Sequence, residues 1–278
     1  MRLLTLNSVL VATDLGETSF PAIRTAARLA PLAGAGLHLM HVAADRSGDG
    51  ENQLAEHFRR AVPDAADPAS VRVVRGPPAA MIVEYANQLG ADVVILGPHR
   101  RLTATGPLGS TATNVVRTAP CPCLVASTEL RLPLERVLVP VDISDVASAA
   151  LSLALSWASA LRSPGGSADL VALHVSQKPD PRSEHDRVHG EVGRARELAR
   201  GAAHVVFSEQ LVYGSDPAKE ILRHAASMSA DLVVMGTRGT GGTSSELGSV
   251  ADAVVRDTPC PLLLVPPAVS QRRNDVSG

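Results

Sequence analysis

Short runs of valine, leucine and isoleucine alternate along the chain with longer alanine-rich stretches whose apolar residues recur at helical spacing. A buried parallel strand is a near-continuous apolar run, whereas a covering helix is apolar on one face only. The pattern therefore predicts βα units that build parallel sheets with helices on both faces. The runs expected to be strands are 8 to 12, 37 to 43, 71 to 75, 92 to 96, 123 to 126, 136 to 141, 169 to 175, 205 to 212, 231 to 236 and 261 to 265.

Two helix starts can be predicted from capping chemistry. Ser144 precedes a helical pattern that runs to Leu161, with Leu151, Leu155 and Ala158 on one face, and a serine hydroxyl is a preferred N-cap. A second helix is expected to begin at Asp216-Pro217, because aspartate is a good N-cap and proline suits the first helical position.

The strand and helix pattern occurs twice. The segment 91 to 97 (ADVVILG) matches 230 to 236 (ADLVVMG) at an offset of 230 − 91 = 139, and nearer the front 9 to 14 (VLVATD) matches 137 to 142 (VLVPVD) at an offset of 128. Fixed-offset similarity of this length indicates a duplication. The sequence therefore predicts two tandem α/β domains, each an open five-stranded parallel sheet, at residues 1–130 and 131–268. They are followed by a polar tail at 269–278 that we expect to be mobile.

Composition narrows the kinds of partner. Formal net charge is −2 with acids and bases interspersed, and aromatic residues make up only 2% of the 278 residues, which argues against nucleic acid and anionic membrane surfaces. Three cysteines form no even disulfide framework, and no apolar stretch approaches the ~20 residues of a spanning helix. Residues 1 to 7 do not resemble a secretory signal. We expect a cytoplasmic protein whose partners are small molecules or other proteins.

A ligand crevice is expected at one edge of each sheet. Open parallel sheets bind ligands beyond the carboxyl ends of their strands, where the strand order reverses. Asp14 and Asp142 close the first strands, and Gly97 and Gly236 close the fourth. These residues are expected to flank one crevice in each copy.

The loop after the fourth strand of the second copy carries the motif most suited to a ligand. Gly236-Thr237-Arg238-Gly239 is followed by eight residues and then by Gly248-Ser249, which opens a helix over 250 to 256. Glycines permit close backbone approach, and a helix amino terminus supplies N–H donors and a favourable dipole for phosphate. The loop matches neither the dinucleotide fingerprint nor the P-loop. It predicts a phosphate site of another type.

These motifs together resemble the universal stress protein family. The resemblance covers nearly the whole chain twice, through the strand ending in Asp142, the turn at 214 to 218 (GSDPA), and the loop from Gly236 to Ser249. It implies ATP as the ligand, often with a divalent ion such as Mg²⁺ or Mn²⁺. The nucleoside contacts that it implies are Pro140, Val141, Asp142 and Val175. The phosphate-side residues are Gly236, Arg238, Gly239, Gly248, Ser249 and Val250. The first copy has Asp14, Val42, Gly97, Gly109 and Ser110 at matching positions.

The first copy departs from the family pattern. Arg100 stands where the second glycine belongs, and Pro98 and Pro107 restrict the loop further. In both copies the spacer is eight residues rather than about nine, since 248 − 239 − 1 = 8. We favour loss of the site in the first copy, because the motif depends on close backbone contact. The alternative is that Arg100 and Arg101 pair with phosphate themselves.

Structural roles compete with several of these interpretations. The glycines can be plain turn residues, and Asp14 and Asp142 can be helix caps. His38 and His41 resemble a metal pair but should point to opposite faces of a strand. His185 and His189 lack the glutamate of a zinc protease. Cys121 and Cys123 are expected to pack as small apolar residues.

The leading functional hypothesis is a stress-response or signalling regulator in which ATP occupancy shifts a conformation that a protein partner reads. The alternative is a nucleotide-free structural or adaptor protein with vestigial pockets. We expect no enzyme, since the chain has no nucleophile elbow or zinc motif. Slow ATP hydrolysis is a third, weaker hypothesis, because no residue suited to positioning water is evident. The apolar terminal strands, 123 to 126 and 262 to 265, predict an internal pseudo-dimer and leave a homodimer open.

Overall fold

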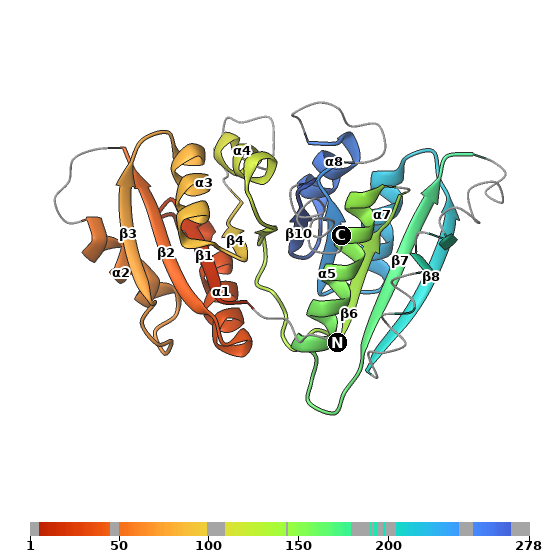
Figure 1. Ribbon diagram of the computed structural model, residues 1–278, viewed down its shortest axis with the longest axis horizontal. Coiled ribbons are helices and arrows are strands. Elements are labelled where there is room, and N and C mark those ends of the chain that lie inside the picture. Colours follow the sequence, from red (N-terminus) through yellow and green to blue (C-terminus); the bar gives the residue numbers. More distant parts are fainter. Residues whose placement is uncertain are drawn as a thin grey trace, which may run out of the picture. The chain divides into compact units, whose positions relative to one another are not determined.

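The computed structural model describes residues 6–44, 50–98, 109–142, 144–178, 204–238 and 247–267, with 189, 190, 192, 193 and 197. The chain divides into two compact units, Thr5–Glu129 and Leu130–Gly278, which we call the N-terminal and C-terminal units. The division falls in the segment where the first repeat ends and the second has not begun. Figure 1 shows the helices and strands of each unit.

The N-terminal unit alternates strands with helices throughout the residues that the structure describes. Its strands are β1 (Ser8–Thr13), β2 (Gly36–Ala43), β3 (Ser70–Arg75), β4 (Val93–Leu96) and β5 (Cys123–Val125). Its helices are the short η1 (Glu17–Ser19), then α1 (Phe20–Ala33), α2 (Gly50–Ala61), α3 (Pro78–Leu89) and α4 (Ser110–Thr118).

The C-terminal unit repeats this order. Its strands are β6 (Arg136–Pro140), β7 (Ala168–Ser176), β8 (Val205–Tyr213), β9 (Leu232–Gly236) and β10 (Leu262–Val265). Its described helices are α5 (Asp145–Leu161), α7 (Pro217–Ser227) and α8 (Ser249–Asp257). The predicted strands are confirmed to within a residue or two at each end.

Both sheets are parallel and share one strand order. The N-terminal order is β3-β2-β1-β4-β5, and the C-terminal order is β8-β7-β6-β9-β10. In each unit the chain first moves outward from the first strand and then returns to its other side, so the order reverses between β1 and β4, and between β6 and β9. Helices α1 and α2 pack against each other, and so do α3 and α4, as expected when right-handed crossovers place each pair on one face of the sheet. The doubly wound α/β fold is confirmed, and each unit has the strand-order reversal at which the ligand crevice is predicted.

The predicted helix caps are present. The Ser144 side chain accepts a hydrogen bond from the Ala147 N–H at 3.2 Å, and Asp216 accepts one from the Lys219 N–H at 3.1 Å. Each bond satisfies one of the donors that a helix start otherwise leaves unpaired. The predicted apolar face of α5 is buried at Leu151, where the side chain is 1% exposed.

A carboxylate at the amino edge of each sheet joins the first and fourth strands. Asp231 Oδ2 accepts hydrogen bonds from the backbone N–H groups of Glu135 (3.0 Å) and Arg136 (2.9 Å). Asp92 Oδ2 does the same for Asn7 (2.6 Å) and Ser8 (3.0 Å). The repeated Ala-Asp pair of the sequence is thus explained by strand stitching, on the edge opposite to the crevice.

The described helices include none that is both long enough and apolar enough to span a membrane. Strands β5 and β10 each lie at one end of their unit's strand order. Their predicted pairing in an internal pseudo-dimer, and a homodimer, stay predictions.

Candidate functional site

The carboxyl end of β6 turns sharply into α5. Asp142 is half-buried there, and its carboxylate accepts a hydrogen bond from the Ser144 hydroxyl. Ser144 in turn caps α5, so Asp142 is not itself the cap. The capping interpretation of Asp142 is therefore wrong for α5: its carboxylate bonds the capping serine and lies beyond the carboxyl end of β6.

A histidine from the neighbouring strand anchors this corner in both units. His174 Nδ1 lies 2.9 Å from the Val141 carbonyl oxygen, and His41 Nδ1 lies 2.8 Å from that of Thr13. Because a carbonyl only accepts, each Nδ1 carries the proton. The Val141 N–H is also occupied, since it donates to Leu173 O at 2.9 Å. Val141 therefore has no N–H left for a ligand and can offer only its side chain and the second lone pair of its carbonyl oxygen. Val175 follows the anchoring histidine on β7.

Gly236 and Gly97 have a packing role at the strand ends. A Cβ on Gly236 would lie 2.7 Å from Val146 Cγ1, and one on Gly97 would lie 3.0 Å from Ser19 Cα. The end of the fourth strand therefore touches the start of the first long helix in each unit. This contact brings the Gly236 end of β9 beside the Asp142 corner.

The two ends of the C-terminal glycine loop are joined. The Gly248 N–H donates to the Thr237 carbonyl at 2.9 Å, and the Thr237 N–H donates to Val265 O at 3.0 Å. The described ends of the loop, Thr237 and Gly248, therefore meet beside the carboxyl ends of β9 and β10, and α8 starts there. Arg238 is half-buried and Ser249 is exposed. Gly239 lies outside the described residues.

The N-terminal counterparts show a matching layout where they are described. Asp14 is exposed and accepts a hydrogen bond from the Gly16 N–H at 2.9 Å, so it too is not the cap of α1. Val42 follows His41 on β2, and Gly109 is the N-cap of α4, whose first residue is Ser110. Arg100, Arg101 and Pro107 lie outside the described residues, so the two interpretations of that loop stay predictions.

A buried polar cluster occurs at the N-terminal corner, and sequence reasoning missed it. Thr13, Ser19 and His57 are 7%, 4% and 4% exposed. The Ser19 hydroxyl lies 2.7 Å from Thr13 Oγ1 and 3.2 Å from His57 Nε2, and it donates to the Gly16 carbonyl at 2.6 Å. His57 comes from α2, and the pattern of that helix alone gives no signal of a partner so distant in sequence.

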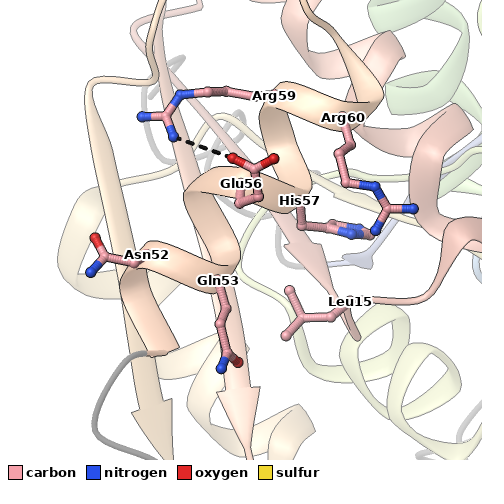
Figure 2. A pocket seen from close by; sticks show the side chains of 7 residues that line it. All are labelled: Leu15, Asn52, Gln53, Glu56, His57, Arg59 and Arg60. Atoms are coloured by element: carbon pink, nitrogen blue, oxygen red, sulfur yellow. Dashed lines mark ion pairs between the residues drawn. The ribbon is translucent and has the colours of Figure 1, made fainter.

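One cavity of about 590 Å³ lies beside this cluster (Figure 2). Leu15, which has a left-handed backbone (φ 64°), forms one side, and all other lining residues come from α2. The charges at the cavity are paired: Arg60 with Glu17 at 2.7 Å, and Arg59 with Glu56 at 3.8 Å. Such exposed pairs contribute little to stability. The lining residues are Leu15, Asn52, Gln53, Glu56, His57, Arg59 and Arg60.

Other candidate chemistry resolves into structural roles. His38 Nδ1 contacts Ser70 Oγ at 2.8 Å, so His38 and His41 have separate partners, as expected for opposite faces of a strand. Within the described part of the chain, no three His, Cys, Asp or Glu side chains are grouped to hold a metal ion. Cys121, Cys123 and Cys260 are buried free thiols, and burial raises the pKa of Cys260 to about 11. His185 lies outside the described residues.

Acidification is expected to destabilise the N-terminal unit through His57. Burial lowers the pKa of His57 below its ordinary 6.5, and nearby Arg60 lowers it further, against Asp14 and Glu17. Between that lowered pKa and 6.5 the unfolded chain binds more protons than the folded chain, so the free energy of unfolding falls as pH falls. The free energy of unfolding, measured with urea at several pH values between about 7 and about 5, should fall less steeply with falling pH for His57→Gln than for the wild type. The same pH dependence in both proteins would contradict this assignment.

A model of the universal stress protein family matches residues 5–127 and again residues 133–266. The chain belongs to the universal stress protein family. The tandem arrangement predicted from the repeat is confirmed, because each match covers one copy.

Similar universal stress proteins occur in mycobacteria. Universal stress protein Rv2005c of Mycobacterium tuberculosis is 31% identical over 206 residues, which is 69% of this chain and 67% of the relative. One from Mycolicibacterium smegmatis is 29% identical over 297 residues, covering 93% of this chain and 97% of the relative. Among solved structures, a universal stress protein from Archaeoglobus fulgidus aligns over 94% of this chain and 98% of its own, with a TM-score of 0.68 and 22% identity, which shows a shared fold.

Proposed function

We propose that the C-terminal unit binds ATP and that occupancy shifts the conformation of its crevice, which a protein partner reads during a stress response. Membership of the universal stress protein family supports the stress-response role. The observation that carries the nucleotide proposal is the meeting of three features where the strand order reverses between β6 and β9. These are the Asp142 corner, the Gly236 end of β9, and the start of α8.

The phosphate side of the proposal depends on which donors are available. The Gly248 N–H is used by Thr237, so Gly248 shapes the loop rather than donating. The first N–H groups of a helix have no partner within the helix, and α8 begins at Ser249 and Val250. These groups and the helix dipole suit the phosphates. Arg238 and Gly239, which follow Thr237 in the same loop, are the further phosphate-side residues of the proposal. A Mg²⁺ or Mn²⁺ ion would be held mainly by the phosphates, consistent with the lack of a metal cluster among the described residues.

The nucleoside side depends on side-chain contacts and one carboxylate. Pro140 and Val141 are buried at the end of β6, and their neighbour Val175 is half-buried. Apolar contacts of this kind suit a base, and the Asp142 carboxylate suits a ribose hydroxyl or an amino group. In this proposal the protein is a cytoplasmic regulator rather than an enzyme, and hydrolysis is not part of its action.

Asp142→Ala is expected to weaken ATP binding by about tenfold, because a hydrogen bond to a charged group contributes roughly 1.5 kcal/mol or more. Calorimetric titration of the full chain with ATP and magnesium measures this loss. The matched control is Asp14→Ala at the equivalent N-terminal position, which should leave the affinity unchanged. The count of nucleotide released on denaturing the purified protein should be about one per chain.

The alternative is a nucleotide-free adaptor with vestigial crevices. No nucleotide in the purified protein, and no heat on titration with ATP, would favour it over our proposal. Equal weakening by Asp14→Ala and Asp142→Ala would instead indicate two working sites.

A further inference from the structure

The buried cluster of the N-terminal unit has one arrangement of protons. The Ser19 hydroxyl gives its proton to the Gly16 carbonyl at 2.6 Å. The proton between Ser19 and Thr13, whose oxygens lie 2.7 Å apart, must then come from Thr13. No hydroxyl proton remains for His57 Nε2, so Nε2 carries a proton of its own, which it donates to Ser19 Oγ at 3.2 Å, with Thr13 Oγ1 slightly farther away at 3.4 Å.

Every hydrogen-bonding position of Ser19 Oγ is thereby filled. It donates once and accepts twice, and the second acceptor bond ties α2 to the corner between β1 and α1. Thr13 Oγ1 also accepts the Leu15 N–H at 3.0 Å, which fixes the left-handed turn. The His57 ring packs against Phe20 with ring centroids 5.0 Å apart. One imidazole therefore holds a helix, a strand end and a strained turn together.

This cluster is specific to the N-terminal unit. At the offset of 128 that relates the two corners, Thr13 corresponds to Val141 (13 + 128) and Ser19 to Ala147 (19 + 128). Neither side chain can form a hydrogen bond. The two units therefore share the histidine anchor on the second strand but not this second tie.

We propose that His57 is an internal ligand that locks the N-terminal corner, and that its removal exposes a binding site for a small N–H-donating heteroaromatic ring such as imidazole. The site consists of the Ser19 and Thr13 hydroxyls and the Phe20 ring, and the cavity beside Leu15 gives it access to solvent (Figure 2). In His57→Ala the Cβ is kept, so the space left is that of the missing ring.

Amide hydrogen exchange of the full chain, without nucleotide, tests the lock. His57→Ala should exchange at least about tenfold faster in α2 and in residues 14 to 19, because a buried hydrogen bond and its packing are lost. Imidazole added at a pH where it is neutral should return both segments toward wild-type rates. It should have no such effect on Ser19→Ala, in which His57 still fills the space. Gln53→Ala, an exposed change on the same helix, is the matched control and should exchange like the wild type.

Two results would overturn the inference. Wild-type exchange rates in His57→Ala would show that the imidazole locks nothing. Equal rescue by 1-methylimidazole, which has the ring but no N–H, would show that packing alone acts and that the hydrogen bond to Ser19 is not the tie. If His57→Ala does not fold, His57→Gln tests the same bond, because its amide N–H can donate to Ser19, and it should protect α2 better than His57→Leu.

The lock has one consequence that rests on the proposed function. With the N-terminal corner fixed, ATP should change amide exchange at residues 140 to 147 and leave residues 14 to 19 unchanged. An ATP effect at the N-terminal corner of the wild type would contradict the lock. If ATP changes amide exchange nowhere, the result counts against the proposed function. The lock is then still tested by comparing the exchange of His57→Ala with that of the wild type in the absence of nucleotide.

Discussion

Asp231→Ala is expected to destabilise the C-terminal unit by about 3 kcal/mol. The carboxylate is 3% exposed and accepts two backbone hydrogen bonds, from Glu135 and Arg136, with Arg131 at 3.7 Å. Alanine would leave two backbone donors without an acceptor in a place that water reaches poorly, and each such loss costs about 1 to 3 kcal/mol. Asp231→Asn keeps an acceptor oxygen and should cost clearly less.

The chain provides a reporter for this measurement. Its single tryptophan, Trp157, is 1% exposed and lies in α5 of the C-terminal unit. When urea unfolding is followed by tryptophan fluorescence, the midpoint of the transition should therefore lie at a lower urea concentration for Asp231→Ala than for the wild type. The matched change Asp92→Ala should alter far-ultraviolet circular dichroism and leave the tryptophan transition nearly in place. A tryptophan transition that is the same in Asp231→Ala and the wild type would refute the stitching role.

Gly239→Val is expected to weaken ATP binding by more than about tenfold. A side chain at the second glycine should push the loop backbone away from phosphate, and losing one charge-assisted contact costs about 1.5 to 3 kcal/mol. The hydrogen bond between Gly248 and Thr237 joins the two described ends of this loop.

The matched change in the first copy is Arg100→Gly. It should leave the affinity of the C-terminal site for ATP nearly unchanged. The same titration shows whether this change restores a weak second ATP site. Calorimetric titration of both variants with ATP and magnesium compares them directly. If Gly239→Val binds like the wild type while Arg100→Gly abolishes binding, the site belongs to the other unit.

Much of the fold could be predicted from local sequence. Buried parallel strands are continuous apolar runs, and the caps at Ser144 and Asp216 depend on neighbours three residues away, so both are visible without a structure. The repeat then fixed the number of units. The neighbourhood of Asp142 and Gly236 could also be predicted, because they lie at the carboxyl ends of β6 and β9, which pair in the sheet, whereas the ligand crevice there stays a prediction.

The remaining features depend on contacts between segments far apart in the chain. Ser19 and His57 are separated by 38 residues, and Asp231 and Arg136 by 95 residues. Nothing in the local pattern of α2 marks His57 as a partner of Ser19. Gly236 shows a second limit of prediction from sequence. Its place in a glycine motif suggested that the backbone approaches a ligand, but the atom that an added Cβ would meet first belongs to the Val146 side chain.

The carboxylates of Asp92 and Asp231 hold the first strand of each copy from the amino edge, whereas the Asp14 and Asp142 corners lie at the carboxyl ends of those strands. The copies share the histidine anchor of this corner but differ at Thr13, where the second copy has Val141. Such a change at the carboxyl end leaves the bonds at the amino edge untouched. One copy can therefore gain or lose polar chemistry at its corner while its first and fourth strands stay joined.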